Sequence, residues 1–201
     1  MRYELNCKEK IEYNAKIKEE IISRIVYLEK EIEGLESIEN VTDIIIKKNV
    51  EDKDIPFENR IPISILISTN GGQLKAAKFL INLINGSKTP INTVCISNTY
   101  SAGGLILVSG HKRYMYKNSI FHIHDLSSGT FGKLTDMEEM LKDIKIYRKW
   151  MEEIYDERSR IPKNIMDDIM NNKREVVFNF KQCLKYHIVD DIIEDFMDIY
   201  K

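Results

Sequence analysis

The chain has 201 residues, of which 43% are hydrophobic and 31% charged, and its formal net charge is −2. This length suits one domain with at most a small appendage. The nearly neutral net charge gives no sign of the basic surface that a nucleic-acid partner requires. No apolar run approaches the roughly 20 residues that span a bilayer, and the N-terminus lacks the apolar core of an export signal. We therefore expect a cytoplasmic protein without a membrane or nucleic-acid partner.

The cysteines are Cys7, Cys95 and Cys183, widely spaced and without a CxxC pair. Such spacing argues against a disulfide framework or a thiolate zinc site and fits a reducing compartment. Cys95 lies in the apolar run TVCI, so we expect a small buried hydrophobic residue rather than a reactive thiol.

In the N-terminal part, the patterns that indicate helices and strands are weak. Residues 1–20 are polar and carry a helix-like spacing of isoleucines, and 24–28 (RIVYL) fits either more helix or a short strand. Its β-branched and aromatic residues favour the strand. We expect a short amphipathic helix around 38–45 and an exposed charged loop over 50–60.

From residue 61 the pattern is stronger. Apolar runs predict buried strands at 63–68 and 91–97, helical spacing predicts a helix over 73–85, and further strands are expected near 113–116 and 119–124. Residues 101–110 (SAGGLILVSG) predict a short, fully apolar helix. Alternating strands and helices indicate parallel pairing with right-handed crossovers.

A long amphipathic helix is predicted over about 133–158. It exceeds what one small sheet can cover, so it either packs on its own sheet or buries part of its length against another subunit, and we favour the second. Helices at 162–172 and 179–186 follow, and 188–193 (IVDDII) is expected to end the core.

Two turns contain chemistry-bearing residues. Asn70-Gly71-Gly72 follows a buried strand, where glycines let main-chain N–H groups point outward at a ligand. Ser101 begins the apolar helix. Taken alone, Ser101 is best interpreted as a helix N-cap. A nucleophile at this place would gain from the helix dipole and from nearby N–H groups.

His122 and His124 are two positions apart on one predicted strand, so their side chains share a face. A metal pair is sterically possible there, but no carboxylate or cysteine cluster completes such a site, and we predict neither metal nor cofactor. GxGxxG, P-loop, GxSxG and HExxH motifs are absent. The residues alone therefore give a serine and a histidine in suggestive positions.

The ordered set of segments resembles the proteolytic subunit of the Clp protease (ClpP family). The glycine turn looks like that family's Ser-Pro-Gly-Gly turn, and Ser101-Ala102-Gly103-Gly104 resembles its nucleophile segment. The other matching positions are Arg113-Tyr114, Asn118-Ser119, Ile123-His124, Ser128-Gly129, Thr135-Asp136 and Tyr186 to Asp190. The similarity runs from about residue 24 to 193.

The resemblance implies an α/β ClpP/crotonase-like fold of stacked βαβ units with a long protruding handle helix at about 133–158. It divides the chain into an N-terminal segment over 1–20, with an axial loop and a short helix, and one peptidase domain over 21–201.

The resemblance also implies the site. Ser101 would be the nucleophile, His124 the general base, and the backbone N–H groups of Gly72 and Ala102 the oxyanion hole. Substrate would pair with the backbone around Gly71 and around Ser127, Ser128 and Gly129. The third catalytic position is occupied by Glu175, where the family has Asp. Its extra methylene moves the carboxylate.

Other positions depart from the family, among them Asn70, Tyr100 and Asp125-Leu126, which suggests a divergent member. Family members form stacked heptameric rings and receive polypeptide from an AAA+ unfoldase. Two alternatives to a peptidase stay open. The first is a catalytically silent subunit with an assembly role, and the second is an acyl-CoA enzyme of the related crotonase fold.

Overall fold

The computed structural model describes residues 7–129, 131–172 and 174–200. Its first half contains α1 (Cys7–Ile22), β1 (Ile25–Leu28), η1 (Glu36–Ile38), α2 (Glu39–Glu51), η2 (Phe57–Asn59), β2 (Ile63–Thr69), α3 (Leu74–Gly86) and β3 (Ile91–Tyr100). The second half contains α4 (Ala102–Val108), β4 (Lys112–Tyr116), β5 (Ile120–Ile123), α5 (Leu134–Arg158), α6 (Lys163–Asn172), β6 (Val176–Phe178), α7 (Phe180–Lys185), β7 (Asp191–Ile193) and η3 (Phe196–Tyr200).

The strands form one sheet in the order β1-β2-β3-β4-β7, and every pair along this path is parallel. The predicted α/β architecture with parallel strands is confirmed. Besides β2, the long strand β3 has two further partners: its first half pairs with β4, and its last residues, Asn98 to Tyr100, pair with β5. The pairing partner of β3 therefore changes from β4 to β5 as the strand approaches Ser101. One short strand, β6, was not predicted, and it pairs with β5 in the antiparallel sense.

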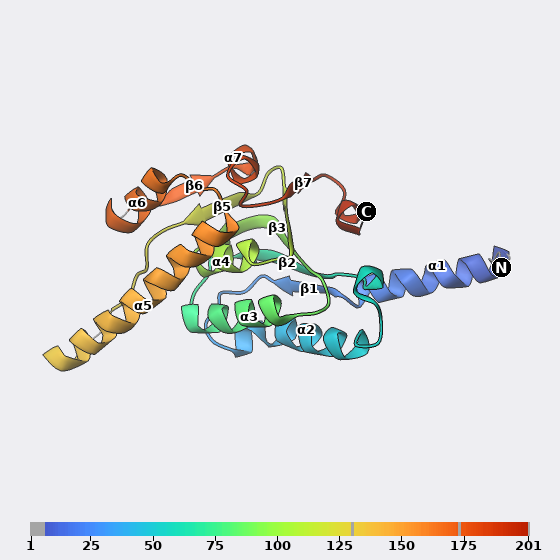
Figure 1. Ribbon diagram of the computed structural model, residues 1–201, viewed down its shortest axis with the longest axis horizontal. Helices are drawn as coiled ribbons and strands as arrows, with labels where there is room; N and C mark the ends of the chain where they lie inside the picture. The colour runs from blue at the N-terminus through green and yellow to red at the C-terminus, as the bar shows by residue number, and fades with distance from the viewer. Residues whose placement is uncertain (1–6, 130, 173, 201) are drawn as a thin grey trace.

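Helix α4 lies at the centre of the main core. All of its residues are buried, as its uniformly apolar sequence requires. Helices α2 and α3 pack beside it on the same side of the sheet, and Cys95 and Cys183 are also buried in this core (Figure 1). The expectation for Cys95 is confirmed.

A second, smaller hydrophobic cluster covers the sheet away from this core. Leu66, Val94 and Tyr114 pack there against Ile199 of the C-terminal turn η3. The Tyr200 hydroxyl lies 2.8 Å from the Ser64 hydroxyl. The expectation that the core ends with residue 193 is therefore wrong, because the last turn supplies apolar cover for the strands.

Two helices project from opposite ends of the molecule, α1 at one end and the first half of α5 at the other (Figure 1). The second half of α5 packs on the body through buried Met151 and Tyr155. Its projecting part carries large exposed apolar side chains, namely Leu134, Met137, Leu141 and Ile146. In the described part of the chain, no helix combines the length and the apolarity that crossing a bilayer demands.

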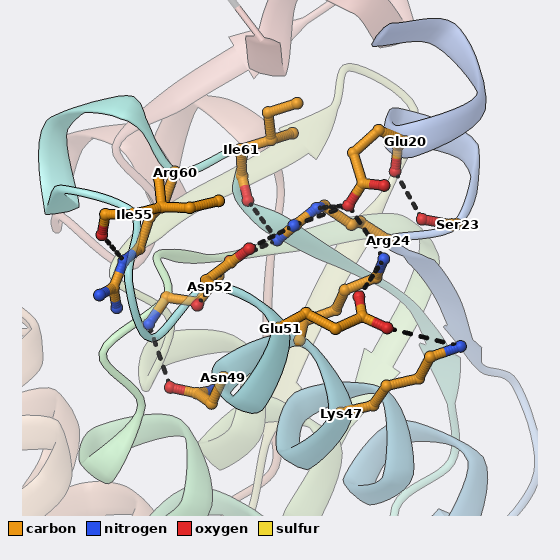
Figure 2. A network of polar contacts seen from close by, with 12 residues as sticks. Glu20, Ser23, Arg24, Lys47, Asn49, Glu51, Asp52, Ile55, Arg60 and Ile61 are labelled. Carbon is orange, nitrogen blue, oxygen red and sulfur yellow. Dashed lines mark hydrogen bonds and ion pairs between the residues drawn. The ribbon is translucent and has the colours of Figure 1, made fainter. Parts of the chain in front are cut away.

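A buried ion-pair network fastens the base of α1 to the body (Figure 2). The Arg24 guanidinium donates to both oxygens of Asp52 over 2.7 and 2.6 Å, and also to Glu20 and to the Ile61 carbonyl. The side chains of Arg24 and Asp52 are 4% and 1% exposed. The expectation of an exposed loop is wrong at Asp52, because a buried arginine requires this carboxylate as its partner.

Candidate active site

Ser101 stands in a strained backbone conformation between β3 and α4, with φ of 54° and ψ of −123°. A non-glycine residue at positive φ costs about 1–3 kcal/mol and persists only where its surroundings enforce it. Here its N–H donates to the His122 carbonyl over 3.1 Å, and its carbonyl accepts from Gly104 N–H over 2.9 Å. Its side chain makes no capping hydrogen bond. Ser101 thus occupies the N-cap position, as expected from the sequence, but its Oγ does not cap the helix.

Strand β5 brings His122 beside Ser101, and His124 directly follows the end of this strand. Tyr100 pairs with His122 in the sheet, so His124 lies two residues further along the strand direction. The two imidazole centroids are 5.6 Å apart, consistent with side chains on one face. Nδ1 of His124 lies 2.5 Å from the Asp125 carbonyl oxygen.

This contact fixes the tautomer of His124. A carbonyl oxygen only accepts, so Nδ1 must carry the hydrogen, and Nε2 of the neutral ring is left with its lone pair free. A general base that removes a hydroxyl proton through Nε2 needs this tautomer. Within the described residues, no hydrogen bond joins Ser101 Oγ to this ring, and such bonds commonly tighten only when substrate binds.

Gly71 allows the glycine turn to lie directly against the nucleophile segment. Its φ is 89°, and a Cβ built on it would stand 2.6 Å from the Tyr100 carbonyl oxygen and 2.8 Å from Ser101 Cβ. The same Cβ would stand 2.9 Å from the Ala102 nitrogen. The turn and the start of α4 are therefore in contact through main chain, which only glycine permits.

The neighbouring Gly72 leaves its N–H available. Ile32 N–H donates to the Gly71 carbonyl over 2.7 Å, and Gln73 N–H donates to the Ile32 carbonyl over 2.6 Å. In this parallel bridge the Gly72 N–H points away from Ile32, and it has no partner in the described part of the chain. Gly72 and Ala102 thus come together from separate elements, as expected of two oxyanion donors, and this role stays a prediction.

Replacing Gly71 with alanine is expected to lower kcat for peptide hydrolysis at least about 10-fold, because the methyl group must displace the Ser101 backbone. Steady-state kinetics with a fluorogenic peptide measure the effect. Gly86→Ala is the matched control, since a Cβ there meets nothing within 4 Å. Equal rates for both variants would show that the turn does not position the nucleophile.

A groove of about 700 Å³ runs between the glycine turn, the loop after His124 and α5. Three of the predicted oxyanion and substrate-binding residues, Gly72, Ser127 and Ser128, line it together. Gly71 and Gly129 do not line the groove. Gly71 lies in the same turn and packs against Ser101, and Gly129 follows Ser128 in the loop. The apolar part of the wall comes from Ile32, Leu74, Leu126, Met140, Ile144 and Tyr147.

The charged residues of this groove are mainly acidic. Its lining contains the carboxylates of Glu31, Glu33 and Asp143 and, among the described residues, one lysine, Lys75. Glu31 and Glu33 are exposed on the segment between β1 and η1. A groove with this charge favours cationic side chains of a bound peptide.

Glu175 immediately precedes β6, which pairs with β5 and aligns Val177 with His122. Its carboxylate oxygen Oε2 lies 3.5 Å from Nε2 of His122, and the side chain is 72% exposed. The structure thus places Glu175 beside His122 and not at His124, the ring that it was expected to hold. Its role as a third catalytic member stays a prediction.

His122 was assigned no catalytic role from the sequence, but it contacts residues of the site. Its ring packs edge-on against Tyr100 with centroids 4.9 Å apart, and Nδ1 is buried without a hydrogen-bond partner in the described chain. Burial lowers the pKa of His122 and outweighs the raising effect of Glu175. Spacing on the strand predicted that the histidines share a face, but no sequence signal could show which ring the carboxylate reaches or that a main-chain carbonyl holds His124.

The amino-acid sequence matches the model of the Clp protease family over residues 12–196. The ATP-dependent Clp protease proteolytic subunit of Deinococcus radiodurans is 26% identical over 134 residues, which cover 66% of this chain and 65% of that protein. The ATP-dependent Clp protease proteolytic subunit 2 of Bacillus licheniformis is 29% identical over 138 residues, which cover 68% and 72%.

Proposed function

We propose that this chain, which belongs to the Clp protease family, is a serine endopeptidase that cleaves unfolded polypeptides or short peptides. The observation that carries the proposal is the strained Ser101, whose side chain caps nothing and whose backbone touches an outward-facing glycine turn. Strain of this kind is expected where a side chain must be presented to a substrate.

In the proposed mechanism, Ser101 Oγ attacks the peptide carbonyl while Nε2 of His124 accepts its proton. His124 then passes this proton to the leaving amine, and water hydrolyses the acyl-enzyme by the same route. The N–H groups of Gly72 and Ala102 receive the developing oxyanion. Losing one such donor typically costs about 10²–10³ in kcat. Glu175 would stabilise the imidazolium of His124.

The substrate is proposed to bind as an added strand in the groove, paired with the backbone near Gly71 and near residues 127–129. The apolar wall would receive side chains on one face of this strand, and the acidic wall those that point toward Glu31 and Glu33. No cofactor is needed for this chemistry.

The chain is further proposed to act in the cytoplasm as stacked heptameric rings, fed by an AAA+ unfoldase. Exposed apolar residues along the projecting half of α5 support its role as a handle that packs on another subunit. The division into a segment over 1–20 and a domain over 21–201 remains a proposal, and the expected axial loop falls partly on residues outside the described ranges.

One observation favours a second candidate, the catalytically silent subunit. Glu175 contacts His122, and Ser101 Oγ is not bonded to His124 in the described chain. A fluorophosphonate probe combined with native mass spectrometry decides between the two. The peptidase is expected to label on Ser101 in an assembly far heavier than the 23.6 kDa chain. An assembled ring without label would establish the silent subunit.

Peptides with Arg or Lys flanking the scissile bond are expected to be cleaved with higher kcat/KM than peptides with Glu there. Glu33→Gln should lower this preference about two- to five-fold, because one partly solvated charge pair is lost. Glu58→Gln in η2, outside the groove lining, is the control. The preference should also shrink at high salt. A preference that Glu33→Gln and salt leave unchanged would contradict a role for the acidic wall.

A further inference from the structure

We propose that His122 is a positioning residue that competes with His124 for the Glu175 carboxylate, and thereby limits how well His124 acts as a base. This proposal rests on the proposed peptidase function. His122 lies near the nucleophile and the proposed mechanism does not use it, although it makes the contact predicted for its neighbour.

The geometry makes one carboxylate available to two rings. His122 is held in place: it is 9% exposed, lies within strand β5, and packs edge-on against Tyr100. Glu175 is the movable partner, with a side chain that is 72% exposed. Because the two imidazole centroids are 5.6 Å apart on one face, a rotation of this side chain suffices to transfer the carboxylate from His122 toward His124.

The hydrogen-bonding state of His122 supports the competition. Its Nδ1 is buried without a partner in the described chain, so a second proton there would be unsatisfied and costly. In the favoured neutral ring Nε2 carries the hydrogen and lies 3.5 Å from Glu175 Oε2, which is long for a hydrogen bond. The competing contact is therefore weak when His122 is uncharged and strengthens to an ion pair when His122 is protonated.

His124 does not need Glu175 for its tautomer, because the Asp125 carbonyl already accepts its Nδ1–H. What the carboxylate adds is charge near the imidazolium that forms during proton transfer. With Glu175 held at His122, this charge lies farther from His124, and the transition state receives less stabilisation. Removing the competitor should therefore raise kcat and leave KM unchanged.

The pH dependence follows from the groups that face His122, namely Glu175 before β6, His124 on the same edge and Tyr100 from β3. The neighbouring Arg174 is paired with Asp168. As the pH falls through the lowered pKa of His122, this ring gains a proton and binds Glu175 more tightly. Protonation of His122 should then make the acid limb of kcat steeper than in a variant that lacks this imidazole.

The test compares wild type, His122→Phe, Glu175→Gln and the double variant in peptide hydrolysis from pH 5 to 8. Phenylalanine keeps a ring against Tyr100 and removes the contact with Glu175. His122→Phe should raise kcat about two- to five-fold, the size of one partly solvated ion pair, and should make the acid limb less steep. Glu175→Gln should abolish this gain in the double variant. A His122→Phe variant that assembles correctly and loses activity would overturn the proposal.

A second measurement keeps the proposal testable without catalysis. NMR titration of the histidine ring protons in the assembled protein should show that Glu175→Gln lowers the pKa of His122 further, since the nearby negative charge is removed. His111 and His187 are internal references that should not move. An unchanged His122 pKa would overturn the proposal, even if the chain hydrolyses no peptide. A shifted His122 pKa in a chain that hydrolyses no peptide would refute the peptidase function but would confirm the contact between His122 and Glu175.

Discussion

Replacing Ser101 with alanine is expected to lower kcat for a fluorogenic peptide by about 10⁴- to 10⁶-fold while the assembly stays intact. The variant keeps the oxyanion donors but has no atom that can form the acyl-enzyme, and removal of a serine nucleophile typically leaves only the residual rate of the site. Initial-rate kinetics together with native mass and fluorophosphonate labelling measure this result.

The control is Ser23→Ala, which removes an exposed hydroxyl at the end of α1 that bonds the Glu20 carbonyl, far from the site in the fold. It should retain full activity and labelling. Because alanine tolerates positive φ poorly, circular dichroism and thermal unfolding must show that Ser101→Ala is folded. Equal hydrolysis by wild type and by a folded Ser101→Ala would refute the nucleophile assignment and favour a site that works through backbone N–H groups alone.

Replacing Arg24 with methionine is expected to lower the free energy of unfolding by about 3–5 kcal/mol. The change leaves the carboxylate of Asp52, which is 1% exposed, without its bidentate partner and with Thr89 as its remaining side-chain donor. Urea unfolding at one fixed protein concentration measures the loss. Lys149→Met breaks an ion pair whose side chains are 78% and 57% exposed, and should change stability by less than about 0.5 kcal/mol.

The double variant Arg24→Met/Asp52→Leu should recover most of this loss, because it buries no unpaired charge. Failure to recover would indicate that shape, and not charge, makes the position sensitive. The network also has a pH signature. Burial alone would raise the pKa of Asp52, but hydrogen bonds from Arg24 and Thr89 outweigh it and leave the pKa below its usual range.

A carboxyl pKa lower in the folded chain than in the unfolded chain stabilises the fold above the unfolded value of about 3.9. This stabilisation is lost as the pH falls through the folded pKa. Unfolding of wild type should therefore become easier below about pH 4. The acid dependence should be weaker in the double variant, which has no carboxyl group at position 52.

Helix α1 projects from the body and is fastened at its base through Glu20 and Arg24 (Figures 1 and 2). Lys48 reinforces the same point by pairing with Glu20 over 2.9 Å and with Glu51 over 2.8 Å. These pairs join the last turn of α1 to α2.

The main helices and strands could be predicted from the amino-acid sequence. Continuous apolar runs predicted β2 and β3, the uniformly apolar stretch after Ser101 predicted the buried helix α4, and the long amphipathic pattern predicted α5. The order of the small motifs identified the family resemblance and selected Ser101 and His124. These features depend on local periodicity and on residue order, both of which are present in the linear chain.

Other features depend on contacts between segments that are far apart in the sequence, and only the three-dimensional structure shows them. It gave Asp52 a buried arginine 28 positions earlier, folded η3 over the sheet, and formed β6 beside β5. It also placed Glu175 at His122 and gave His124 a main-chain acceptor. The physical reason is that partner choice for a polar group depends on distances of a few ångström between segments far apart in sequence, and neither periodicity nor motif order encodes these distances.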